Sequence, residues 1–370
     1  MSTTQELYAQ RTRRIAAAVA LEKPDRVPFV PLGDAFAARI MGVPLADFCT
    51  KPEVAYPTII EAFRRIGEVD GVQHASFNVA TLSTMWLSKA KWPGRDLPVD
   101  DLWQIEELEL MTPDDYDVIA DQGYGAWLET FIPRAGLEAE FEMARNQFAP
   151  SLPEAFRAWE AEGIPVFCPV MTTIPYEYFC GARSMRPFML DLFRMPDRVE
   201  AAMQATMPFI IERARHSIRS LGLTGMRLGG WRSAGEFLSP KLWERFVFPY
   251  YKELLAAVLD EGVTPVFHFD SNWTRDLERL RDFPRATCVL SLDGSTDIYR
   301  AKEVLGDHMC IMGDVPPALL SLGTPDEVYE YSARLVREIG PSGFILAQGC
   351  DIPPDASAEN VAAMIAATRS

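Results

Sequence analysis

The sequence predicts an α/β protein, a (β/α)8 barrel of the TIM type with an insertion between its second and third strands. Eight short runs rich in Val, Ile, Leu and Phe are bounded by Gly, Pro or charged residues, as buried parallel strands are. Helical patterns separate most of these runs, and eight repeats favour a closed barrel over an open sheet. We therefore expect a single barrel domain over residues 1–370.

The expected elements follow in chain order. Residues 196–221 and 240–261 have amphipathic helical spacing, with Pro249 as a kink or boundary in the second. Thr324 and Ser357 each begin a further helix as its N-cap. The eight expected strands are residues 27–32, 71–77, 165–170, 225–230, 264–269, 287–292, 309–313 and 343–347.

The stretch 78–163 interrupts this alternation. It contains Pro93-Gly94, acidic turns and a polar helical stretch near residues 137–149. We interpret it as an insertion within the barrel domain that lies over the barrel mouth.

Composition excludes several classes of function. The net charge is −16, from 36 basic and 52 acidic residues, and there is no basic stripe, so no nucleic-acid role is expected. No stretch approaches the ~18 apolar residues that a membrane span needs. The six cysteines show no CxxC spacing, which is typical of a reducing compartment, and we expect a cytoplasmic protein.

Potential metal ligands stand at two distant strand ends. His268 and Asp270 end one apolar run, and Cys350 follows another eighty positions later. In a barrel the carboxyl ends of the strands meet at one mouth, and His268 and Asp270 share one strand parity. Imidazole, carboxylate and thiolate all bind Zn²⁺, so the three predict a zinc site. The alternative is that His268 is hydrogen-bonded in the core, Asp270 caps a turn and Cys350 is a small buried residue.

Other candidates also follow strand ends. Glu236 is a potential fourth ligand or acid–base group, or a solvated loop residue. Trp231 and Trp273 would line a ligand site or pack the rim. Asp34 and Asp293 would bind a ligand or cap a helix. Phosphate-binding, dinucleotide-binding, HExxH and GxSxG motifs are absent from the sequence.

Several segments together resemble the uroporphyrinogen decarboxylase superfamily. The most specific is Gly349-Cys-Asp-Ile-Pro-Pro-Asp-Ala-Ser-Ala-Glu-Asn-Val361. The others are residues 22–28, 237–252, 264–268, 313–317 and 323–325. The resemblance extends over nearly the whole chain and implies a (β/α)8 barrel.

The superfamily contains two chemistries. Its decarboxylases share an arginine-rich N-terminal motif for porphyrinogen carboxylates, and residues 31–39 lack such a cluster. Its other branch contains zinc methyltransferases that work with corrinoid proteins and share His-x-Cys and a later Cys. His268 and Cys350 match that motif, while Asp270 replaces the first Cys, which favours zinc contact with an ether or alcohol oxygen. Residues 93–98 with Gln104 resemble methoxyarene demethylases.

The resemblance thus implies methyl transfer between an oxygen substrate, an aryl methyl ether, and a corrinoid on a separate protein. His268, Asp270 and Cys350 would bind Zn²⁺, and Glu236 or Asp351 would orient a ligand or supply a proton. Two alternatives are a metal-free decarboxylase with Asp34 as polar anchor, and a non-catalytic tetrapyrrole-binding barrel. The expected partners are a small methoxylated substrate and the corrinoid protein, and a homodimer stays open.

Overall fold

Parallel strands of the computed structural model, which describes residues 3–369, form a closed barrel. Six lie side by side in chain order: β3 (Met171–Thr173), β4 (Gly225–Gly230), β5 (Thr264–Phe269), β6 (Val289–Leu292), β7 (Cys310–Val315) and β8 (Phe344–Gln348). Two short segments complete the ring, because Phe29 bridges Leu346 of β8 and Val72 bridges Val166, just before β3. The amide of Asp70 donates to the carbonyl of Phe29 at 2.9 Å and joins these two segments. The predicted (β/α)8 barrel is confirmed.

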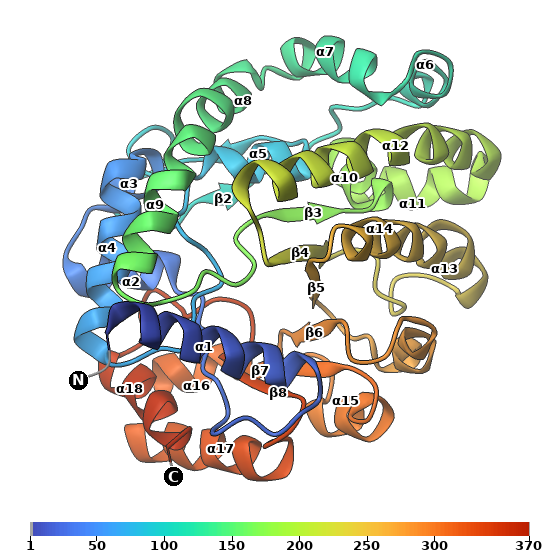
Figure 1. Cartoon of the computed structure of the whole chain (residues 1–370). Coiled ribbons are helices and arrows are strands. Elements are labelled where there is room, and N and C mark those ends of the chain that lie inside the picture. Colours follow the sequence, from blue (N-terminus) through green and yellow to red (C-terminus); the bar gives the residue numbers. More distant parts are fainter. Residues whose placement is uncertain (1–2, 370) are drawn as a thin grey trace.

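Helices surround the strands, as Figure 1 shows. Between the first two barrel segments lie α2 (Asp34–Met41), α3 (Leu45–Thr50) and α4 (Pro52–Ile66). The helices after β3 are α10 (Pro175–Arg183), α11 (Met185–Arg194), α12 (Pro196–Leu221), α13 (Pro240–Phe246), α14 (Phe248–Asp260), η2 (Thr274–Asp282), α15 (Ile298–Leu305), α16 (Pro317–Leu322), α17 (Pro325–Glu338) and α18 (Ala358–Ala367). Within residues 3–369, no helix has the length and apolar character needed to cross a membrane.

The inside of the barrel is apolar at one end. Val266, Val289 and Ile345 belong to a buried cluster that also takes in Ile15 of α1 (Thr4–Val19). Phe267, between Val266 and His268, belongs instead to the larger cluster formed with the helices, as the alternation along a strand requires. Helix α1 therefore closes the amino end of the barrel, and polar chemistry is left to the carboxyl end.

The inserted segment, residues 78–163, lies between the second and third barrel segments and forms several helices and a hairpin. Its elements are α5 (Ala80–Trp86), the hairpin β1 (Ala90–Lys91) and β2 (Gln104–Ile105), α6 (Asp114–Gln122), α7 (Tyr124–Ala135), α8 (Glu138–Met143), η1 (Ala144–Phe148) and α9 (Ala149–Ala161). Trp103 stacks on Phe77 at 4.3 Å, and Glu107 pairs with Arg232 after β4. The segment therefore reaches the loops at the carboxyl ends of the strands.

A buried carboxylate joins α1 to the first two barrel segments. Asp70 is fully buried and pairs with Arg14 at 2.5 Å and with Arg26 at 2.7 Å. It also accepts the amide of Phe29 at 3.0 Å. Asp25 binds the same Arg14, but its side chain is 56% exposed. Since Asp70 contacts both arginines, and Asp25 supplies the second negative charge, Asp70 is the centre of this junction.

Candidate metal centre

His268, Asp270 and Cys350 meet at the carboxyl end of the barrel. One potential ligand atom from each lies within 4.8 Å of the other two. His268 is on β5, Asp270 follows that strand directly, and Cys350 follows β8. Nε2 of His268 and Oδ1 of Asp270 are 3.2 Å apart. Strand parity and barrel closure thus bring together residues that are eighty positions apart, as expected from the sequence.

The surroundings of His268 suit a metal ligand. Its Nδ1 lies 3.2 Å from the hydroxyl of Ser291 on the neighbouring strand β6. A proton on Nδ1 would be donated to that hydroxyl, and Nε2 would keep its lone pair toward Asp270 and Cys350. Ligating histidines are commonly oriented by such a second hydrogen bond. Ligand atoms about 2.0–2.3 Å from a tetrahedral zinc stand between three and four ångströms apart, so small side-chain adjustments would complete the site.

The pKa values of Asp270 and Cys350 are shifted in opposite directions. Burial opposes ionisation of Asp270, but His268 and Arg227 lower its pKa below the usual value. The residue Cys350 is exposed, yet protein surrounds its thiol, and this crowding together with Asp270 and Asp351 raises the thiol pKa well above its usual range. A cation would therefore displace a proton from Cys350 on binding.

A hydrogen-bonded chain crosses the barrel beside this cluster. Arg227 of β4 is buried and donates to the side-chain oxygen of Gln73 and, at 3.3 Å, to Nε2 of His74. Nδ1 of His74 lies 3.0 Å from Oδ2 of Asp34. Since a guanidinium can only donate, Nε2 accepts and the proton of His74 is on Nδ1, where it is donated to Asp34. Asp34 is thus a link in this chain.

The other predicted site residues lie around the cluster in different roles. Asp351 follows Cys350, and burial together with the charge of Asp34 raises its pKa well above the usual value. Its Oδ1 is shielded from solvent and has no hydrogen-bond partner among residues 3–369. Asp293 accepts the amides of Ser271 and Ser295 and shapes the loops after β5 and β6. It serves as a turn residue there.

Two candidates take the plainer of their expected roles, one as an exposed loop residue and one as a rim-packing residue. Glu236 is exposed and accepts the amide of Asn272 at 2.9 Å, so it bridges two loops and is not part of the ligand cluster. Trp273 is fully buried and stacks on Phe269 at 3.8 Å, because the chain turns back after Asp270 and tucks the ring against the outer side of β5. Trp273 therefore packs the rim and has no free face for a cofactor.

Trp231 lies closer to the mouth. Its ring centre is 4.5 Å from that of Trp86 in the inserted segment, and 7% of the residue is exposed. Glu177 of α10 holds this loop by accepting the amides of residues 231, 232 and 233 at 3.0–3.1 Å. Burial raises the pKa of Glu177 to about 7. The loop after β4 is therefore fixed from α10.

A family model described as uroporphyrinogen decarboxylase (URO-D) matches residues 172–370, more than half of the chain. The chain belongs to the uroporphyrinogen decarboxylase family. The matched part begins within β3 and contains β4 to β8, and with them all three residues of the ligand cluster.

Relatives of this URO-D family chain are distant. A uroporphyrinogen decarboxylase of Syntrophotalea carbinolica is 33% identical over 36% of this chain and 38% of that protein. One of Geobacter metallireducens is 32% identical over 50% and 53%, and one of Coxiella burnetii 26% identical over 52% and 51%. The chain thus spans about half the length, or less, of these relatives.

A solved structure is similar over nearly the whole length. It is a methyltransferase from Methanosarcina mazei, with a TM-score of 0.73 and 18% sequence identity. The similarity covers 97% of this chain and 98% of that one, and it shows that the two share a fold.

Asp314 gives this URO-D family chain a pH-dependent stability. Burial, aided by Asp297 and Asp293, raises its pKa to about 7, and Tyr331 donates to it at 3.3 Å. Because its folded-state pKa is raised, the contribution of Asp314 to stability is most favourable below about pH 4, falls as the pH rises to about 7 and is constant above. Asp314→Asn should remove this slope, on the order of 4 kcal/mol. Urea unfolding between pH 4 and 8 measures it, and an unchanged slope would contradict the assignment.

Arg227, Gln73 and Glu177 were not predicted from the sequence. For Arg227 a signal exists, since it is a charged residue inside the buried run Gly225-Met-Arg-Leu-Gly-Gly230. For Glu177 there is none, because its partners are backbone amides more than fifty positions away.

Proposed function

We propose that this protein is a methyltransferase that moves a methyl group from an aryl methyl ether to a corrinoid carried by a separate protein. The observation that carries the proposal is the approach of His268, Asp270 and Cys350 to within 4.8 Å of one another at the barrel mouth. One histidine, one carboxylate and one thiolate form a typical zinc donor set that leaves a fourth position open. The fold shared with the Methanosarcina mazei methyltransferase also supports a methyltransferase.

The three side chains would hold a zinc ion, which would polarise the ether oxygen and make the departing phenolate less basic. His268 is kept in orientation by Ser291. Asp270 keeps the donor set harder than two thiolates would, which favours an oxygen ligand. In the reaction the bond between the methyl carbon and oxygen breaks, the reduced corrinoid supplies the electron pair for the new bond, and the phenolate takes up a proton.

Other residues would shape the electrostatics. Arg227 is held by Gln73 and by the His74–Asp34 pair, and its positive charge lowers the pKa of Asp270. A fixed cation beside the site favours the negative charge that develops on a departing oxygen. Asp351, whose Oδ1 has no hydrogen-bond partner among residues 3–369, would orient a ligand or supply a proton.

The named relatives support a second candidate, a decarboxylase. Against it, the first helix after strand 27–32 carries a single arginine, Arg39, whose guanidinium binds the carbonyl of Asp100. Zinc content and methylation of free cob(I)alamin by methoxylated aromatics decide between the two. A metal-free protein that decarboxylates a porphyrinogen would reject the methyltransferase. Tight tetrapyrrole binding without any turnover would favour a binding protein.

Asp270→Cys tests the choice of ligand. The variant should keep about one zinc per chain, because thiolate is a strong zinc ligand, but should demethylate aryl ethers about tenfold more slowly, because a second thiolate weakens the Lewis acid. Metal analysis and the rate of cob(I)alamin methylation measure these effects. An undiminished rate would show that the carboxylate has no role in selecting an oxygen substrate.

A further inference from the structure

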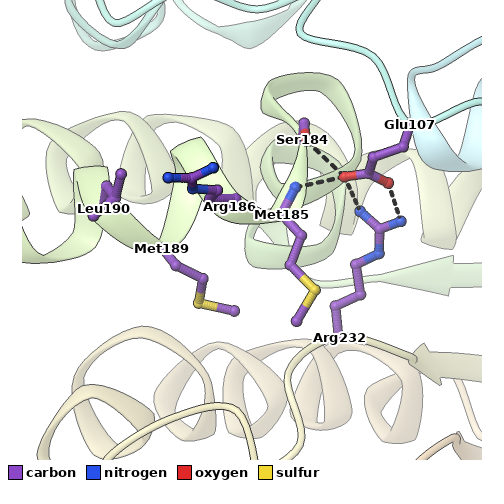
Figure 2. Close-up of a pocket in the computed structure, with 7 residues that line it drawn as sticks. All are labelled: Glu107, Ser184, Met185, Arg186, Met189, Leu190 and Arg232. Atoms are coloured by element: carbon purple, nitrogen blue, oxygen red, sulfur yellow. Dashed lines mark hydrogen bonds and ion pairs between the residues drawn. The ribbon is translucent and has the colours of Figure 1, made fainter.

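A cavity opens between the inserted segment, α11 and the loop after β4. Its volume is about 640 Å³. It is lined by Glu107, Ser184, Met185, Arg186, Met189, Leu190 and Arg232 (Figure 2). Ser184 to Leu190 belong to the connection after β3, and Arg232 follows the end of β4. The cavity therefore faces the same side as the strand ends that carry the ligand cluster.

One wall of this cavity is rigidly built. Glu107 of the inserted segment pairs with Arg232 at 2.5 Å and accepts the hydroxyl of Ser184 at 2.7 Å and the amide of Met185 at 2.6 Å. Figure 2 shows these contacts converging on the one carboxylate. Arg232 is neutralised in this way, and the wall is formed before any ligand arrives.

The other wall is the outer face of α11, which is apolar and exposed. Met189, Leu190 and Phe193 share it, and Leu190 and Phe193 are 40% and 80% exposed. A phenylalanine exposed to this degree next to a cavity indicates a contact surface. Residues three and four positions apart lie on one helix face, so the side chains form a continuous stripe.

Two cations flank the stripe. Arg186 and Arg194 are exposed, and neither takes part in an ion pair or hydrogen bond with any residue from 3 to 369. The chain as a whole carries a net charge of −16, so two unpaired arginines on one helix run against the overall charge. We name this apolar stripe with its two arginines, residues 185–194, the α11 rim surface.

The charges indicate what covers the α11 rim surface. If two copies of the chain paired this helix face about a two-fold axis near Leu190, each copy's Arg186 would lie beside the other copy's Arg194. Like charges in contact oppose such pairing. A partner protein with an apolar patch surrounded by acidic side chains would match both the apolar stripe and the two arginines.

We infer that the α11 rim surface docks the corrinoid-carrying protein, through an apolar contact at Phe193 and Leu190 and acidic side chains that meet Arg186 and Arg194. This inference rests on the proposed function. It places the partner where the corrinoid can reach the strand ends while the Glu107–Arg232 wall stays intact.

The test compares two methyl acceptors, free cob(I)alamin and a cobalamin-loaded corrinoid protein. The variants are Phe193→Ser and the double substitution Arg186→Glu with Arg194→Glu. Arg13→Glu is the matched control, since Arg13 is exposed on α1 at the opposite end of the barrel. Both rim variants should raise the KM for the corrinoid protein by about tenfold or more, as loss of an interface anchor does. Their turnover with free cob(I)alamin and the behaviour of Arg13→Glu should stay within about twofold of the wild type.

Each outcome is distinguishable. An unchanged KM for the corrinoid protein, or an equal loss with free cob(I)alamin, would overturn the docking surface and leave the methyltransferase standing. A wild type that methylates neither acceptor would reject the proposed function and the docking surface with it. Light scattering that finds a wild-type dimer dissociated by Phe193→Ser would assign the surface to a second copy of the chain instead.

Discussion

Cys350→Ala should leave the protein folded but without bound zinc, and should slow aryl ether demethylation by about a thousandfold. Three protein ligands are the usual minimum for a catalytic zinc, and Cys350 supplies one of only three potential ligand atoms in the cluster. A zinc ion contributes several kcal/mol to stabilising charge in the transition state, and about 4 kcal/mol corresponds to that factor. The thiol lies on the loop after β8, outside the apolar interior, so its loss has little effect on packing.

The measurements are zinc per chain after dialysis and the rate of cob(I)alamin methylation. Cys49→Ala is the matched control, because Cys49 is a buried cysteine of α3 that is not part of the ligand cluster. His268→Ala should reproduce the loss seen with Cys350→Ala. Full zinc content in both site variants would show that the ion, if bound, is held elsewhere.

Asp70→Asn should lower the free energy of unfolding by about 3–5 kcal/mol at neutral pH. The amide could still accept the hydrogen bond from Phe29, but Arg14 and Arg26 would lose their shared buried counter-charge. Breaking one partner of a buried ion pair leaves an uncompensated charge, which is why the effect is large.

Urea unfolding at neutral pH measures this loss. Asp25→Asn is the matched control, because Asp25 binds the same Arg14 at 2.5 Å but is more than half exposed. An exposed pair contributes roughly 0–1 kcal/mol. If Asp70→Asn and Asp25→Asn were equally destabilised, burial of Asp70 would not explain the loss of stability. The stability of the junction would then depend on its total charge.

Much of the barrel was predictable because buried strands have a distinctive pattern. The bounds of β4 and β5 coincide with the expected runs 225–230 and 264–269, and α12 coincides with 196–221. The first two barrel segments were also located correctly, although each makes only a single bridge in the ring.

The candidate site was predictable only where a strand positions the residue. His268 and Asp270 follow strand parity, and Cys350 follows from the convergence of strand ends. Loop residues obey neither rule, which explains why the sequence left the roles of Glu236 and Trp273 open. Contacts across the barrel, such as that of Arg227 with Gln73, depend on which strands face each other through the interior, and a period of two along a strand carries no such information.

For the zinc site proposed above, the order in which the ring closes would affect metal loading during synthesis. The first barrel segment pairs with β8, and Cys350 follows β8 directly. A nascent chain that has emerged only as far as β5 therefore presents His268 and Asp270 without their third partner, in a sheet whose outer edges are still unpaired. We expect such chains to discriminate poorly between cations, so that selection of the final ion waits until the last strand has joined the first.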